Sequence, residues 1–110
     1  MIVLYPFIIL QADEGPYPAR YLAGDRTFRW ATATNDELKE KMGILNAYYL
    51  PGVDCSNPRL YPWITPVNSF RIVLDLYFGT DLGALDDKSY VYANYSRPYD
   101  FLDVTDKVKT

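Results

Sequence analysis

Runs of apolar residues predict two strands in the first half of the chain. Residues 7–10 are apolar at every position, a pattern typical of a strand covered on both faces in a parallel sheet, and we expect this strand to span 7–11. Residues 44–50 form a second, mostly apolar stretch that stops at the turn signal Pro51-Gly52. The segment between them is long enough to hold the crossover that parallel strands need. The pattern therefore predicts a mainly parallel sheet.

Local start and stop signals predict two helices. The first, over residues 35–42, follows Thr34, which forms a capping-box pattern with Glu37. The second, over residues 66–78, has a proline at its first position and ends before a glycine. The first helix is mostly polar, so we expect it to be largely solvated. The second is apolar around most of its circumference and is expected to be the best-buried element.

The last part of the chain completes the predicted fold. Residues 90–95 and 101–104 form two short extended segments, which either pair with each other or lie along the sheet edge. No repeat, low-complexity tract or interdomain linker divides the 110 residues. The predicted fold class is therefore α/β, a small three-layer-type fragment with a mainly parallel sheet, in a single domain over residues 1–110.

Composition and charge narrow the classes of function. Hydrophobic residues make up 49% of the chain and charged residues 23%, as in globular domains. The formal net charge of −3, without a basic stripe, argues against a nucleic-acid partner. Because the chain has no histidine, catalytic triads that need one are excluded, and the lone Cys55 cannot form a disulfide within the chain. Residues 1–10 are apolar but too few to span a bilayer, so no membrane segment is predicted.

The candidate chemistry lies directly after the first strand, where the chain reads Asp13-Glu14-Gly15. Enzymes of the α/β class present metal ligands or acid-base groups at the carboxyl end of a central strand. The simpler alternative is an ordinary polar strand end, in which Asp13 accepts backbone hydrogen bonds within a glycine turn. The loop that follows carries Arg20, Arg26 and Arg29, which are candidates for binding an anion beside this site unless they are merely solvated.

Other charged residues are assigned structural roles. Asp81, Asp86 and Asp87 lack the spacing of a calcium loop and are predicted to form a solvated turn. Arg71 is expected to extend along its apolar helix to solvent or to pair with Asp75, one helical turn further on.

Five segments together resemble the C-terminal part of sulfatase-like proteins of the alkaline phosphatase superfamily, akin to uncharacterised membrane-anchored relatives of lipoteichoic acid synthases. They are Asp13-Glu14-Gly15 and residues 43–52, 61–70, 77–81 and 97–101. The resemblance covers nearly the whole chain, from about residue 7 to residue 104. It implies metal-dependent chemistry on phosphate or sulfate esters, in which a hydroxyl or modified cysteine nucleophile attacks and the metal neutralises developing charge.

The resemblance also implies a metal site. The family's strand ends in Asp-His-Gly, whose Asp and His bind metal; here Asp13 and Gly15 match, and Glu14 stands in the place of the histidine. Asp13 and Glu14 are therefore the expected ligands of a divalent ion, either Mg²⁺, Mn²⁺ or Zn²⁺. A second carboxylate in place of a neutral ligand favours the harder ions over zinc. No catalytic residue is assigned, and the substrate-binding residues stay unknown.

The family's nucleophile and its first Asp ligand would lie upstream of Met1. We therefore expect the chain to be the C-terminal portion of a larger domain, inactive alone, whose partner is the upstream half of the same fold or another copy of itself. By the same resemblance, the full-length protein would work at the extracytoplasmic face of a membrane. The alternative is a stand-alone, non-catalytic interaction domain derived from that fold.

Overall fold

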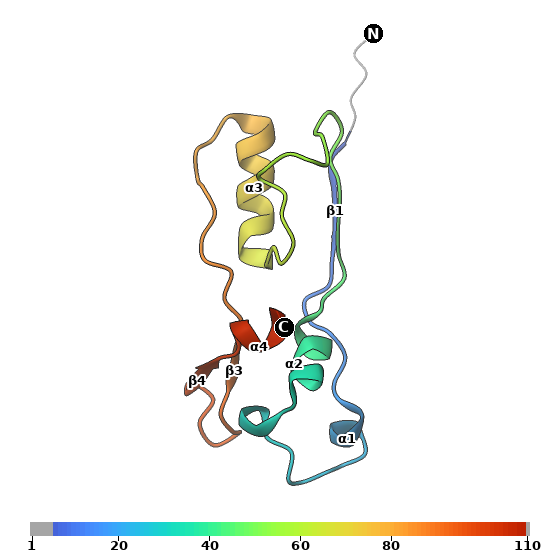
Figure 1. Cartoon of the computed structure of the whole chain (residues 1–110), viewed down its shortest axis with the longest axis vertical. Coiled ribbons are helices and arrows are strands. Elements are labelled where there is room, and N and C mark those ends of the chain that lie inside the picture. The colour runs from blue at the N-terminus through green and yellow to red at the C-terminus, as the bar shows by residue number, and fades with distance from the viewer. Residues whose placement is uncertain (1–5, 110) are drawn as a thin grey trace. The chain divides into compact units, whose positions relative to one another are not determined.

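The computed structural model describes residues 6–109, which form two compact units (Figure 1). The first unit comprises residues 6–11 and 46–87, and the second comprises residues 12–45 and 88–109. The first unit holds β1 (Ile8–Gln11), β2 (Asn46–Tyr49) and α3 (Pro66–Phe78). The second unit holds α1 (Ala19–Leu22), the 3₁₀ helix η1 (Trp30–Thr32), α2 (Asn35–Met42), β3 (Tyr90–Tyr92), β4 (Phe101–Asp103) and α4 (Thr105–Lys109).

The predicted mainly parallel sheet is wrong. Within residues 6–109 the strands form two antiparallel pairs, β1 with β2 and β3 with β4. The strands predicted over 7–11 and 44–50 do exist in shortened form, and Gln11 lies opposite Asn46. The second pair joins the two extended segments expected near the C-terminal end. The class is still α/β, but the three-layer arrangement around a parallel sheet is not formed.

The direction of β2 follows from where residues 12–45 go. These residues leave β1 and return to β2 at the same end of the pair, where the Ala12 amide donates a hydrogen bond of 2.9 Å to the Leu45 carbonyl. A parallel second strand would require the chain to cross the sheet and re-enter at the opposite end. Instead, the intervening residues pack with residues 88–109 in the second unit.

The β1–β2 pair, which we call the ribbon, carries large apolar side chains on both faces, and its inner face also carries the polar pair Gln11 and Asn46. On its inner face Phe7 stacks on Tyr77 of α3, with ring centres 5.4 Å apart, and the Gln11 amide donates a 2.8 Å hydrogen bond to the Ser69 hydroxyl. The outer face carries three large apolar side chains that are more than half exposed: Ile8 (51%), Leu10 (57%) and Tyr49 (56%). Among residues 6–109 no third strand pairs with the ribbon. One face is therefore packed, while the other face lies open.

Both predicted helices have the expected bounds. In α2 the Thr34 hydroxyl accepts a 3.1 Å hydrogen bond from the Glu37 amide, and the Glu37 carboxylate accepts one of 2.9 Å from the Thr34 amide, which completes the capping box. The α3 helix begins at Pro66 and is ended by Gly79, whose φ of 65° is the left-handed conformation that glycine adopts freely.

The α3 helix is buried on one side only, so the expectation that it is the best-buried element is not met. Asn68, Ser69, Ile72 and Val73 are buried, whereas Val67, Phe70, Leu74 and Phe78 are exposed. In the first unit the ribbon runs along one side of the helix and the loop that follows α3 runs along the other (Figure 1). The exposed residues form a stripe between these two sides.

The core of the second unit is built by residues from several elements. It consists of Phe28, Trp30, Leu38, Val91, Val104 and Val108. The Phe28 and Trp30 rings meet edge to face, with centres 4.9 Å apart, and α2 packs against α4. The α2 helix, expected to be largely solvated, therefore contributes the fully buried Leu38 to this core.

Candidate functional site

Asp13 and Glu14 lie where the sequence places them, immediately after β1. Both residues are exposed, and the Glu14 side chain retains 52% of its accessible surface. The Glu14 carboxylate is not free, because it lies 2.9 Å from the ammonium group of Lys41 in α2. The Asp13 carboxylate makes no hydrogen bond or ion pair within residues 6–109.

Lys41 fixes this turn against α2 within the second unit. Its ammonium group also donates a 3.1 Å hydrogen bond to the Gly15 carbonyl and lies 3.5 Å from the centre of the Tyr17 ring. The Gly15 amide in turn donates a 2.8 Å hydrogen bond to the Lys41 carbonyl. Lys41 is only 8% exposed, so its charge is balanced almost entirely by the carboxylate, the carbonyl and the aromatic ring. A metal ion that used Glu14 would compete with this buried lysine.

The two candidate ligands therefore differ in what they can do. Asp13 can offer its carboxylate to an ion, whereas Glu14 already has a structural cation. Within residues 6–109 no group of three or more His, Cys, Asp or Glu side chains is placed to hold a metal ion. The structure brings the two carboxylates to one turn but gathers no further ligand from the described part of the chain.

Two of the three arginines in the predicted anion-binding loop form hydrogen bonds within the chain. The Arg20 guanidinium makes two hydrogen bonds to Glu37, of 2.7 and 2.8 Å, and lies 4.7 Å from the centre of the Phe28 ring. Arg29 donates to the carbonyls of Phe28 and Arg26. Of the three candidates only Arg26 is left as an exposed side chain whose guanidinium has no such contact in residues 6–109.

The Arg20–Glu37 pair makes the second unit sensitive to acid. Hydrogen bonds from Arg20, and next from the Thr34 amide, lower the pKa of Glu37 from 4.5 to about 2. A carboxyl group with a lowered pKa in the folded state stabilises the fold above its usual pKa, and this contribution is lost as the pH falls through the lower value.

We predict that Glu37→Gln lowers the melting temperature by about 2–4 °C at pH 7, because the variant keeps the capping box but loses an ion pair that is partly exposed. The difference from the wild type should shrink between pH 4.5 and pH 2 and vanish below it. Melting followed by circular dichroism across this pH range measures the effect. Glu40→Gln, which removes an exposed charge from the same helix, is the matched control. An equal loss in both variants would contradict the assignment.

Asp87 is a structural residue that the sequence prediction missed. One of its carboxylate oxygens accepts hydrogen bonds from the Thr65 amide (2.8 Å), the Thr65 hydroxyl (2.6 Å) and the Asn68 amide group (2.9 Å), and the other accepts one from the Tyr61 hydroxyl. Burial raises the pKa of Asp87, but these hydrogen bonds outweigh it and hold the pKa below its usual value. Burial and the neighbouring carboxylate raise the pKa of Tyr61 to about 12. The predicted solvated turn is therefore wrong at Asp87.

The expected pair of Arg71 with Asp75 is also not formed. Arg71 donates to the carbonyls of Leu82 and Gly83, while Asp75 lies 2.9 Å from the Arg59 guanidinium. Hydrogen bonds from the Thr80 hydroxyl and from loop amides lower the pKa of Asp75 to about 2. Both side chains hold the loop after α3 against the helix. The sequence shows no local signal for such contacts, since the partners lie outside the helix.

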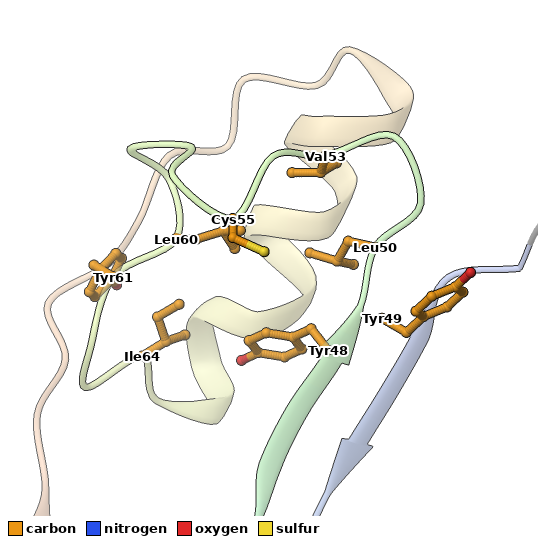
Figure 2. Close-up of a pocket in the computed structure, with 8 residues that line it drawn as sticks. All are labelled: Tyr48, Tyr49, Leu50, Val53, Cys55, Leu60, Tyr61 and Ile64. Atoms are coloured by element: carbon orange, nitrogen blue, oxygen red, sulfur yellow. The ribbon is translucent and has the colours of Figure 1, made fainter.

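The first unit also contains a largely apolar pocket of about 420 Å³. It is lined by Tyr48, Tyr49, Leu50, Val53, Cys55, Leu60, Tyr61 and Ile64. Figure 2 shows the Tyr48 ring turned toward α3 and Ile64, while the adjacent Tyr49 ring lies on the side of β1. The exposed Cys55 has no histidine beside it, because the chain has none, so nothing activates its thiol as a nucleophile. The pocket can receive an apolar group but offers no chemistry.

None of the helices within residues 6–109 combines the length and the apolarity needed to cross a bilayer. Comparison of the chain with protein-family models, with curated proteins and with solved structures finds no match.

Proposed function

We propose that this chain is the C-terminal portion of a metal-dependent, sulfatase-like hydrolase or transferase that acts on phosphate or sulfate esters, and that it is inactive alone. The observation that carries the proposal is the ribbon, whose outer face is apolar although it is exposed. Antiparallel strands that face water on one side normally alternate apolar and polar residues, and this ribbon does not. Its outer face is suited to being covered by further polypeptide.

The position of Asp13 supports the metal-dependent part of the proposal. The residue follows β1 directly, and its carboxylate is exposed. Hard ions such as Mg²⁺ and Mn²⁺ bind through one or two carboxylates and keep several waters, so a single free carboxylate suits them. Zinc usually takes four ligands, commonly nitrogen or sulfur, which makes it the least suitable of the three expected ions here. When bound, the ion would neutralise charge on the transferred group.

Inactivity alone follows from the chemistry that the chain carries. Transfer through a covalent intermediate needs an activated nucleophile, and hydroxyl or thiol nucleophiles are activated by a neighbouring base, by a lowered pKa or by a metal. The chain has no histidine to serve as that base. Ser69 is buried and shares a 2.6 Å hydrogen bond with the Tyr48 hydroxyl, so it serves packing. We therefore propose that the nucleophile and the remaining metal ligands come from another polypeptide segment.

The second candidate is a non-catalytic interaction domain. The observation that favours it is the ion pair between Glu14 and the buried Lys41, because a side chain at the expected metal site serves a structural role instead. In this case the apolar surfaces would be retained for binding and the carboxylates would have no ligand.

Calorimetric titration with Mn²⁺, Mg²⁺ and Zn²⁺ separates the two candidates. We predict weak binding of Mn²⁺ and Mg²⁺ to the wild type, with a dissociation constant on the order of 10⁻³ M, because a single carboxylate is the main protein ligand. Asp13→Ala should remove the heat, whereas Asp36→Ala, which deletes an exposed aspartate from the first turn of α2, should not. Identical titration traces for the wild type and Asp13→Ala would show that Asp13 binds no metal ion, and would favour the non-catalytic interaction domain.

A further inference from the structure

The apolar stripe of α3 is an uncovered surface in the described part of the chain. It consists of Val67 (51% exposed), Phe70 (58%), Leu74 (36%) and Phe78 (63%). These residues are spaced three or four positions apart, so they lie on one side of the helix. The spacing is that of a helix face that packs against a second helix.

The loop after α3 widens this surface. Arg71 donates to the Leu82 carbonyl, and Asn68 exchanges hydrogen bonds with the backbone of Leu85, so the loop is held alongside the helix. Leu82 and Leu85 are themselves 43% and 49% exposed. We call the four stripe residues together with these two leucines the α3 face.

We propose that the α3 face is the contact surface of a homodimer, in which a second copy of this chain packs its own α3 antiparallel across a two-fold axis. This inference concerns the first unit and does not depend on the metal site.

The area of the face fits a dimer of modest affinity. If a large apolar side chain has a full area of about 150–200 Å², the exposed fractions correspond to roughly 500 Å² for each copy. That value lies in the upper part of the range for the largest apolar patch on a typical monomer, about 300–600 Å². Two copies would bury roughly 1,000 Å², which is near the lower limit for a specific interface. We therefore expect association in the micromolar range.

The charges of the face favour a second copy over a charged partner. A two-fold interface places the same patch of both subunits in contact, so charged residues near the axis would meet their own kind. The six residues of the α3 face carry no charge. Arg71 binds loop carbonyls and the Asp75 side chain is only 1% exposed, so neither presents a free charge to the helix stripe. The exposed Asp81 and Asp86 adjoin Leu82 and Leu85 in the sequence, away from the centre of the stripe. The stripe is centred between Phe70 and Leu74, so Phe70 of one copy would face Leu74 of the other.

The test is the mass of the full chain in solution, measured by size-exclusion chromatography with light scattering from about 5 to about 200 µM. The wild type should rise with concentration from 12.7 kDa toward twice that mass. Phe70→Glu should remain a monomer with unchanged helical circular dichroism, because each copy would bury a carboxylate against Leu74 of the other copy with no countercharge. Tyr99→Glu, at a side chain that is 87% exposed and outside the face, should still dimerise.

A mixed sample tests the arrangement and guards against a variant that merely misfolds. Phe70→Glu and Leu74→Lys should each be monomeric, and their equimolar mixture should regain dimer, since each heterodimer brings one glutamate against one lysine. A wild type that is monomeric at every concentration, or that forms an open series of larger species, would overturn the closed dimer. A wild type that stays monomeric would indicate that the α3 face binds a different polypeptide.

Discussion

Asp87→Ala is expected to lower the free energy of unfolding of the first unit by about 3 kcal/mol at pH 7, because it leaves partly buried donors without an acceptor. The affected groups are the backbone amide and the hydroxyl of Thr65, the side-chain amide of Asn68 and the hydroxyl of Tyr61. Asn68 is completely buried, so water cannot readily replace the lost acceptor. Asp87 therefore anchors the start of α3 through Thr65 and the side chain of Asn68, from about twenty residues further along the chain.

Urea unfolding, combined with hydrogen exchange of the α3 amides, measures this loss. Asp86→Ala makes the same change of charge at the neighbouring exposed residue and should alter the stability by no more than about 0.5 kcal/mol. Because the pKa of Asp87 is lowered in the folded state, its contribution is present above the usual pKa of 3.8 and disappears as the pH falls through the lower folded value. Equal effects of the two variants at pH 7 would show that the network does not hold α3.

Gly15→Ala is expected to destabilise the second unit by about 3 kcal/mol, because the added methyl group has no space. A Cβ atom at this position would lie 2.2 Å from the Glu40 carbonyl oxygen and 2.7 Å from that of Lys41. Both obstacles are backbone atoms of α2, which cannot turn aside as a flexible side chain can. The turn that carries Asp13 and Glu14 would have to move away from the helix.

Chemical unfolding measures this effect when it is followed by near-ultraviolet circular dichroism of the aromatic core of the second unit, which contains Phe28 and Trp30. Gly24→Ala is the useful comparison, since a Cβ there meets open space and the only cost is a φ of 83°, about 1–2 kcal/mol. We expect Gly15→Ala to be clearly the more damaging of the two. A smaller loss at Gly15 than at Gly24 would mean that the turn does not approach α2 closely.

Local signals explain which parts of the fold could be predicted. The capping box at Thr34 and the proline and glycine at the ends of α3 act within a few residues, so the sequence predicts both helices with the correct bounds. The strands were also located, but their relative direction depends on where residues 12–45 pack. They pack with residues 88–109, a choice that hydrophobic periodicity does not reveal.

At the candidate site, too, the features set by neighbouring residues are predictable and the contacts between distant residues are not. A strand followed by Asp13 and Glu14 was predicted from adjacent residues, whereas the pairing of Glu14 with Lys41 joins positions 27 residues apart. Lys41 lies in a helix whose mostly polar sequence predicts a solvated surface, so no local pattern indicates its burial. The contacts of Asp87 with Thr65 and Asn68 likewise span about twenty residues, and no sequence pattern marks them.

We propose Asp13 as the ligand of a divalent ion, and Mn²⁺-induced broadening in the nuclear magnetic resonance spectrum of the labelled chain is the decisive test. At low Mn²⁺ we expect selective loss of the amide signals of residues 12–15 in the wild type, and no such loss in Asp13→Ala. Broadening that is absent from these residues, or that is the same in both proteins, would show that Asp13 does not bind the ion.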